Sequence, residues 1–320
     1  MDKRVVVIGG GTGQGNLLQG LKKYTTSITA IVTVADDGGG SGLIRSENRM
    51  LPPGDIRNCL LALSSLDPLM EQLLRHRYES GSIKNQNFGN LLILAFYEIF
   101  GDFEKSIDYV GKMINAKGKV IPSTMEQVRL VGKLENDNVA IGESNIASMA
   151  ISQMTEIRSL ELLPSSPKAT DSAIKAIENA QMIIIGPGSL YTSIIANLLI
   201  PEISQAIMKS PAKKIFVCNI MTEQGETDGF TPMDHINRIK KHVPDLKFDY
   251  VMVNSKRIED NVKRQYEADH KHEVVYNDEQ KEKIKALGLE VISGDFAKVT
   301  DFGHIIHDAD KVFQVMFEIL

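Results

Sequence analysis

Apolar, β-branched runs alternate with helical patterns along most of the chain. Five such runs predict strands buried on both faces, at 4–8, 28–34, 182–186, 214–220 and 249–253. Apolar residues spaced by three and four predict helices between them, at 15–23, 190–199, 202–209 and 232–242. This alternation indicates an α/β fold with a doubly wound, mostly parallel sheet, whose glycine-rich turns meet at the carboxyl edge.

The segment 54–165 departs from this alternation. Its first half predicts helices at 56–65, from Asp67-Pro68 onward, and at 89–100. Its second half predicts short strands around 128–134, 139–145 and 156–163, with a hairpin turn at 135–138. No Pro/Gly/Ser-rich linker brackets the segment, so we interpret it as a helical and β-hairpin insertion in a single α/β domain spanning 1–320. The Lys- and Glu-rich stretch 255–285 predicts a solvated helix.

Composition narrows the classes of partner and compartment. The net charge of −5 argues against broad electrostatic attraction to nucleic acid or anionic membranes. No signal-peptide pattern opens the chain, and the longest apolar stretch, Leu91 to Phe100, is too short to span a bilayer. Cys59 and Cys218 lie in apolar surroundings, which is typical of reduced core residues. We therefore expect a cytoplasmic protein with no membrane span and no nucleic-acid partner.

Three glycine-rich turns follow predicted strands, and we call them elbows one (9–15), two (36–42) and three (186–193). Elbow one offers backbone amides at Gly10, Gly11, Thr12 and Gly13 immediately before a predicted helix. Such a turn suits an anion, because glycine amides converge there and the helix N-terminus adds positive potential. Neither the G-x-G-x-x-G fingerprint nor the Gly-Lys-Ser/Thr of a P-loop is present. A tight strand-to-helix turn without a ligand is the alternative.

Elbow two combines adjacent acids with a second glycine nest. Asp36 and Asp37 end the predicted strand, and Gly39 and Ser41 follow. One carboxylate there suits a ribose or base, or holds Mg²⁺ against phosphates. The alternative is that the acids only cap the glycine loop.

Two helix starts inside the inserted segment carry polar groups that suit a phosphate. Asp55 predicts a helix cap, and Arg57 follows in the first turn, where a cation opposes the helix dipole and therefore suggests another task. Asn58, Asn87 and Asn90 add amides at the same two helix starts. Ordinary capping with a surface arginine is the alternative.

Elbow three and two later strand ends complete the candidate site. The donors expected there are Gly186, Gly188, Ser189 and Thr192 from the elbow, with Asn219 and Asn254 from the strand ends. Taken singly, each strand-end asparagine also suits a hydrogen-bonded turn. No histidine pair has helical metal-ligand spacing, and no catalytic triad is evident. The chain therefore displays a binding apparatus more clearly than a catalytic one.

The motifs taken together resemble the YvcK family of the CofD-like superfamily. They are IGGGTG (8–13), TVADDGGGSGLIR (33–45), PPGDIRNCLLAL (52–63), NFGNLLI (87–93), IPST (121–124), IGPGSLYTSI (185–194), NIMT (219–222) and MVNS (252–255). The resemblance implies a Rossmann-like fold, cytoplasmic location and binding of UDP-sugars such as UDP-N-acetylglucosamine. It also implies a role in cell shape and envelope synthesis during gluconeogenic growth, with a protein partner or homo-oligomer left open.

The same resemblance assigns a ligand-binding role to Tyr266, which follows the MVNS segment. It also implies an Arg-His-Asp near the C-terminus, where this chain has Ile306-His307-Asp308. The related branch, 2-phospho-L-lactate transferase, uses Mg²⁺ and transfers a phosphorylated group, so a transferase is the alternative function. An NAD(P)-dependent oxidoreductase is a weaker alternative, since the dinucleotide fingerprint is broken.

Overall fold

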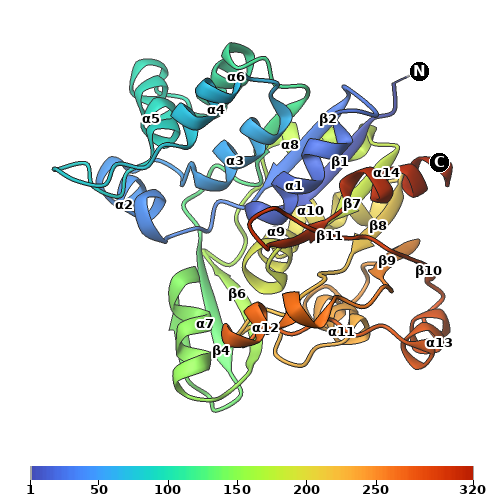
Figure 1. Cartoon of the computed structure of the whole chain (residues 1–320). Coiled ribbons are helices and arrows are strands. Elements are labelled where there is room, and N and C mark those ends of the chain that lie inside the picture. The colour runs from blue at the N-terminus through green and yellow to red at the C-terminus, as the bar shows by residue number, and fades with distance from the viewer. Residues whose placement is uncertain (1, 320) are drawn as a thin grey trace.

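A seven-stranded parallel sheet forms the centre of the molecule in the computed structural model, which describes residues 2–319 (Figure 1). Its strand order is β10-β9-β8-β7-β1-β2-β3, which confirms the predicted α/β fold. The strands are β1 (Val5–Gly9), β2 (Ile28–Val32), β3 (Lys119–Pro122), β7 (Met182–Ile185), β8 (Lys213–Val217), β9 (Tyr250–Asn254) and β10 (Glu290–Gly294). The five predicted strands are all present, and the two edge strands β3 and β10 were not predicted.

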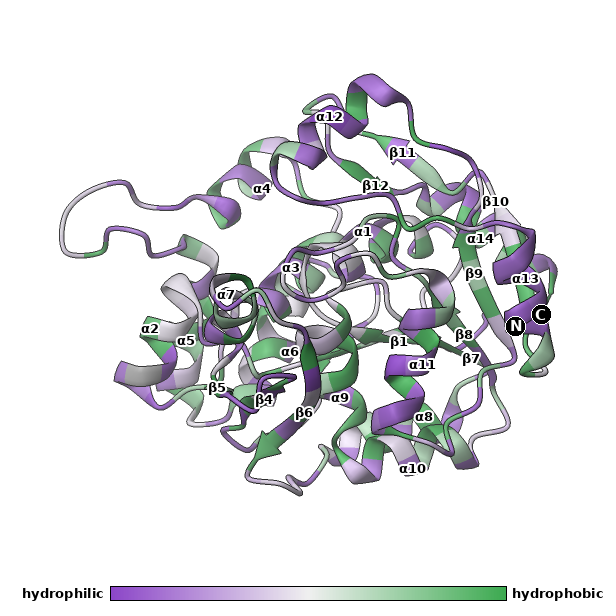
Figure 2. Ribbon diagram, turned by 90° about the horizontal axis from the view of Figure 1, so that it is seen from below, coloured by the Kyte–Doolittle hydropathy of each residue, from purple (hydrophilic) through white to green (hydrophobic). Residues whose placement is uncertain are grey.

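The central strands are apolar because helices cover both faces of the sheet. Every residue of β1 and of β7 is buried. Strand β1 pairs in parallel with β2 on one side, where Val5 lies opposite Ile28, and with β7 on the other, where Val5 lies opposite Met182. Figure 2 shows α1, α3 and α14 on one face of the sheet and α8 and α10 on the other. Strands buried in this way need no polar alternation, which is why the sequence presents them as continuous apolar runs.

Fourteen α-helices and one π-helix are present in the described residues. They are α1 (Gly11–Leu21), α2 (Gly39–Asn48), α3 (Gly54–Leu63), α4 (Pro68–Arg75), α5 (Phe88–Phe100), α6 (Phe103–Met113), α7 (Glu143–Ser152), α8 (Asp171–Asn179), α9 (Ala196–Leu198), α10 (Pro201–Lys209), α11 (Pro232–His242), α12 (Asp260–Ala268), α13 (Asp278–Ala286), α14 (Ala309–Glu318) and the π-helix η1 (Leu190–Ile195). The prediction of one helix over 255–285 is wrong, because the chain leaves the helix after Ala268 and passes through a positive φ at His270 before α13.

The region 54–165 divides into three parts. Helices α3 to α6 come first, β3 then joins the main sheet, and a separate antiparallel sheet of order β5-β4-β6 follows. Its strands are β4 (Arg129–Leu134), β5 (Val139–Ile141) and β6 (Ile157–Leu163). The predicted hairpin turn is confirmed, since the amide of Leu134 donates to the carbonyl of Asn138 at 2.9 Å. The strand predicted at 139–145 ends early, because Gly142 at φ 100° turns the chain into α7.

The topology places a crevice at the carboxyl edge, where strand order reverses between β1 and β7. A small hairpin of β11 (Ala297–Val299) and β12 (Ile305–His307) lies over this edge near α1. Within the described residues no single helix is long and apolar enough to cross a membrane. Two consecutive helical segments, Leu190–Leu198 and Pro201–Lys209, reach the length and apolar composition of a membrane span only when they are taken together, and the chain bends by 74° between them. Cys59 and Cys218 are both buried and free.

Candidate functional site

Elbows one and three lie against each other because their strands, β1 and β7, are neighbours. A methyl group on Gly13 would lie 3.2 Å from the carbonyl oxygen of Pro187, and one on Gly188 would lie 3.1 Å from the carbonyl oxygen of Gly10. Gly11 adopts φ +69°, which favours glycine, and the space beside it is open. Glycine therefore does two things here: it lets the elbows touch, and it leaves elbow one uncovered.

A cavity of about 650 Å³ opens above these two elbows. Its walls come from both elbows, from the loop after β8, from α12 and from β12. The lining residues are Gly10, Gly11, Thr12, Gly13, Asn16, Pro187, Gly188, Ser189, Ser193, Asn219, Ile220, Met221, Thr222, Glu223, Tyr266, Lys271, His304, Ile305, Ile306 and His307. This volume is in the range of small-molecule and cofactor sites.

The cavity offers hydrogen-bond donors and a lysine side chain. The amides of Thr12 and Gly13 belong to the first turn of α1, where helix geometry leaves amides without intrahelical partners. Tyr266 accepts the amide of Ile305 at 2.6 Å through its phenol oxygen, so its own proton is available to a ligand. Lys271 lies on the wall. Burial lowers the pKa of His307 to about 4, so this histidine is neutral and contributes no positive charge.

Two glycine amides of elbow three are already used within the protein. The amide of Gly186 donates to Ile8 in the sheet, and that of Gly188 donates to the side chain of Asn219 at 3.3 Å. Asn219 also donates to the carbonyl of Gly188 at 2.9 Å and so braces the elbow. The Ser189 hydroxyl is hydrogen-bonded to Glu223. Elbow three is therefore braced from within the protein, and elbow one presents the first-turn amides of α1 to the cavity.

No residue of elbow two lines this cavity, and both of its acids accept hydrogen bonds close to helix starts. The Asp36 carboxylate accepts the amide of Gly38 at 2.8 Å and a hydrogen bond from Ser41 at the start of α2. The Asp37 carboxylate accepts the amide of Ser144 at 3.1 Å and its hydroxyl at 3.0 Å at the start of α7. Gly39 supplies the positive φ, +48°, that opens α2. The capping alternative therefore describes the contacts of both acids.

Four partly buried carboxylates, none of which lines the cavity, gather beside elbow one and the start of η1. Asp55 accepts the amide of Gly11, and a methyl group on Gly10 would lie only 2.8 Å from its Oδ2. Burial, with the charge of Asp36, raises the pKa of Asp55 to about 6 and that of Glu143 to about 8. Burial, with the charge of Glu223, likewise raises the pKa of Glu226 to about 8. We call Asp36, Asp55, Glu143 and Glu226 the carboxylate cluster.

Known proteins resemble this chain over nearly its whole length. Residues 5–297 match the family model described as 2-phospho-L-lactate transferase CofD. The chain is 44% identical to the "Gluconeogenesis factor" of Halalkalibacterium halodurans over 99% of its own length and 96% of that protein. It is 42% identical to the "Gluconeogenesis factor" of Bacillus subtilis over 99% and 98% of the two chains. A crystal structure of a UPF0052 family member from Bacillus halodurans superposes with a TM-score of 0.93 at 42% identity, covering 98% and 99% of the two chains.

The chain belongs to the CofD family. Its resemblance to the gluconeogenesis factors within that family, which the sequence motifs predicted, is confirmed.

The structure sorts the residues predicted for this CofD-family site into groups. Eight line the cavity: Gly10, Gly11, Thr12, Gly13, Gly188, Ser189, Asn219 and Tyr266. Asp36, Asp55 and Thr192 lie at the carboxylate cluster, where the Thr192 hydroxyl contacts Glu226 at 3.4 Å. Asn254 lies elsewhere, because it bonds the backbone of Lys256 and Phe296.

Arg57 forms a third group with the predicted asparagines. Its guanidinium donates to Asn90 and to Asn58, both at 2.8 Å, and Asn87 caps α5 by accepting the amide of Asn90. The Nε of Arg57 is buried without a partner among the described residues. The predicted phosphate contact of Arg57 stays a prediction.

Sequence reasoning missed the C-terminal wall of the cavity. Lys271 was interpreted as part of a solvated helix, and His304 and His307 were considered only as a possible metal-binding cluster. Glu143 was missed as well, since it was placed in a strand. No group of three or more His, Cys, Asp or Glu residues suited to hold a metal is found among residues 2–319, so the Mg²⁺ prediction gains no preformed site.

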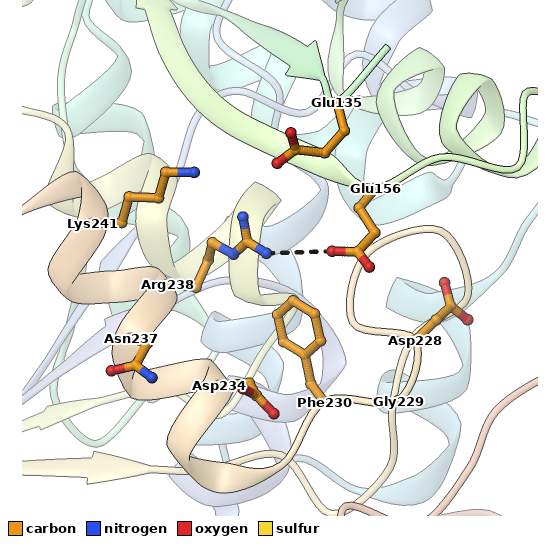
Figure 3. A pocket seen from close by; sticks show the side chains of 9 residues that line it. All are labelled: Glu135, Glu156, Asp228, Gly229, Phe230, Asp234, Asn237, Arg238 and Lys241. Carbon is orange, nitrogen blue, oxygen red and sulfur yellow. Dashed lines mark ion pairs between the residues drawn. The ribbon is translucent and has the colours of Figure 1, made fainter.

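A second cavity, of about 510 Å³, lies between α11 and the three-stranded sheet (Figure 3). Figure 3 shows Arg238 pointing from α11 toward Glu156, at 3.6 Å. The same guanidinium lies over the ring of Phe230 and donates to the carbonyl of Ile157 at 2.9 Å. These contacts join α11 to the start of β6, and none of the predicted site residues lines this cavity.

Proposed function

We propose that this protein binds a UDP-activated sugar, of the UDP-N-acetylglucosamine type, in the cavity above elbows one and three. The observation that carries the proposal is the meeting of the first-turn amides of α1, the ammonium of Lys271 and the phenol of Tyr266 in one cavity. In open α/β sheets, nucleotides bind at the carboxyl edge where strand order reverses, and this cavity lies there.

In this proposal the diphosphate lies against the amides of Thr12 and Gly13, with Lys271 as its counter-charge. Tyr266 donates its proton to the ligand, and Ile305 and Ile306 provide an apolar wall. The carboxylates of Asp36 and Asp37 take no part, because neither lines the cavity and both accept hydrogen bonds from the protein itself.

The protein acts in this proposal as a cytoplasmic regulator and not as an enzyme. Support comes from the name gluconeogenesis factor carried by its relatives. In this proposal the occupancy of the site follows the concentration of the sugar nucleotide, an envelope precursor, during growth on gluconeogenic carbon sources. The ligand-bound protein then binds a partner protein that acts in envelope synthesis and cell shape.

Isothermal titration calorimetry with UDP-N-acetylglucosamine tests the ligand, with UDP and inorganic phosphate as comparisons. Gly11→Asn projects a side chain into the open space at elbow one, in a conformation that asparagine tolerates, and should abolish the binding heat. Gly81→Asn is the matched control: its φ is +77°, its surroundings are equally open, and it lies in the loop projecting between α4 and α5 (Figure 2). Absence of heat with the wild-type protein at millimolar ligand would contradict the proposal.

A transferase is the second candidate, favoured by the CofD family model and by the carboxylate cluster beside elbow one. It predicts turnover of a lactyl-diphosphoguanosine donor with a deazaflavin acceptor in the presence of Mg²⁺. Release of guanosine monophosphate that depends on both the acceptor and Asp55 would establish this function in place of the regulatory one.

A further inference from the structure

The cavity above elbows one and three adjoins another cavity of about 590 Å³, which we call the side cavity. Three residues line both of them: Ser189 of elbow three, Glu223 from the loop after β8, and Lys271 from the segment after α12. A ligand group at the junction of the two cavities therefore meets a hydroxyl, a carboxyl group and an ammonium group.

Glu223 is a half-buried acid whose carboxyl group is only partly used by the protein. Burial raises its pKa, and the Ser189 hydroxyl and the charge of Lys271 oppose that rise. Within the described residues, the Ser189 hydroxyl is the one hydrogen-bond donor to this carboxyl group, whereas a carboxylate offers about four acceptor positions. An acceptor withdrawn from water and left without a donor is costly, so a ligand that donates to Glu223 gains affinity.

Lys271 lies near Glu223 without pairing with it. Glu273, the next acid along the chain from Lys271, pairs instead with Lys263 at 2.7 Å and with Arg257 at 3.4 Å. Lys271 forms no ion pair in the described part of the chain, although its charge is close enough to lower the pKa of Glu223. Opposite charges that share a cavity wall without touching leave room for a ligand group between them.

Hydrogen bonds fix the two segments that carry these charges relative to each other. The amide of Thr222 donates to the carbonyl of His272 at 2.7 Å, and the amide of His272 donates to the hydroxyl of Thr222 at 2.8 Å. The amide of Glu223 donates to the hydroxyl of the buried Thr227 at 2.8 Å. Because the neighbours of both charged residues are held in this way, the gap between the charges is preorganised for a ligand.

The two charges select a neutral group that both donates and accepts hydrogen bonds. Glu223 repels an anion such as a phosphate, and Lys271 repels a cation. A hydroxyl group accepts from the ammonium and donates to the carboxylate through a single oxygen atom. In a UDP-sugar the sugar ring is rich in such groups, whereas the apolar wall of Ile305 and Ile306 suits the uracil ring. This places the sugar, and not the uridine, at the junction.

We propose that Glu223 and Lys271 together bind one hydroxyl of the sugar at the junction of the two cavities, and that this contact makes the protein prefer UDP-sugars to UDP. The inference rests on the proposed function and adds to it the residues that recognise the sugar. The side cavity provides space for the substituents of the sugar ring.

Isothermal titration calorimetry with UDP, UDP-glucose and UDP-N-acetylglucosamine tests this contact. The wild-type protein should bind both UDP-sugars at least tenfold more tightly than UDP. Glu223→Gln keeps the shape of the side chain and removes its charge, so the affinity for both UDP-sugars should fall about tenfold while the affinity for UDP does not fall. Glu267→Gln removes the same charge from an exposed position on α12 and is the matched control, which should bind all three ligands like the wild-type protein.

The pattern across the three ligands separates this inference from the proposed function. Retained UDP binding shows that Glu223→Gln is folded. A loss of UDP affinity equal to that of the UDP-sugars would overturn the inference, because Glu223 would then act on the uridine or on the fold. Unchanged UDP-sugar affinity would also overturn it, and so would a loss confined to UDP-N-acetylglucosamine, which would place the acetamido group in the gap. A wild-type protein that binds none of the three at millimolar concentration contradicts the proposed function itself, and this inference with it.

Discussion

The carboxylate of Asp55 should make the protein less stable as the pH rises, and Asp55→Asn should remove this effect. Burial, reinforced by the charge of Asp36, raises the pKa of Asp55 from 3.8 to about 6. Well below pH 3.8 the carboxyl is protonated in both the folded and the unfolded chain and contributes nothing. Between pH 4 and 6 the unfolded chain loses this proton first, so the free energy of unfolding falls as the pH rises. At 1.36 kcal/mol per pKa unit the cost reaches about 3 kcal/mol near pH 7.

Urea unfolding between pH 4.5 and 7.5, followed by far-UV circular dichroism because the chain has no tryptophan, measures this cost. The free energy of unfolding of Asp55→Asn should exceed that of the wild-type protein by an amount that grows to about 3 kcal/mol at pH 7. Asp245→Asn, at an exposed position, is the control and should track the wild-type curve. Parallel curves for the wild-type protein and Asp55→Asn would refute the reasoning.

Three further predictions concern other parts of the structure. Asp37→Ala removes the carboxylate that accepts the Ser144 amide and hydroxyl. It should cost about 1 to 2 kcal/mol and speed amide exchange across α7 in mass spectrometry; exchange that rises equally everywhere would contradict a local role. Ile306→Arg places a cation on the cavity wall and should tighten UDP-N-acetylglucosamine binding about tenfold in calorimetry, whereas an unchanged affinity would argue against a phosphate near β12. Thr231→Ala breaks the capping box with Asp234 and should lower the free energy of unfolding by about 1 kcal/mol in urea titration, with ligand binding unchanged.

The central sheet could be predicted because strands buried on both faces leave an unmistakable apolar run. The edge strands β3 and β10 could not, since they mix polar residues with apolar ones, as in Glu290–Gly294. Helix α2 was also missed, because its first turn is made of glycines that reduce helix propensity and mask the pattern. Local hydrogen bonds from the Gly38 amide and the Ser41 side chain to Asp36 accompany that helix start.

The glycine cradle of the site could be predicted, and the roles of the acids beside it could not. The local sequence predicts that Asp36 and Asp37 follow a strand. It does not predict that the amide of Ser144, over a hundred residues later, donates to Asp37. The same limit applies to Lys271, whose place on the cavity wall depends on how the chain folds back after α12. Contacts between distant segments decide whether a polar residue faces a ligand or caps a helix.

The position of Gly10 separates the two candidate functions physically. Its backbone lies between the cavity, which it lines, and Asp55, which leaves no room for a side chain there. A nucleotide that binds only in the cavity does not change the protonation of the carboxylate cluster. The carboxyl groups then keep the protons that their raised pKa values give them. A nucleotide that brings a divalent cation to the cluster must displace those protons, since cations bind the ionised form. Titrations at pH 7 in two buffers of different ionisation enthalpy therefore distinguish them: equal heats support a sugar-nucleotide sensor, and heats that differ with the buffer only in the presence of Mg²⁺ support a transferase.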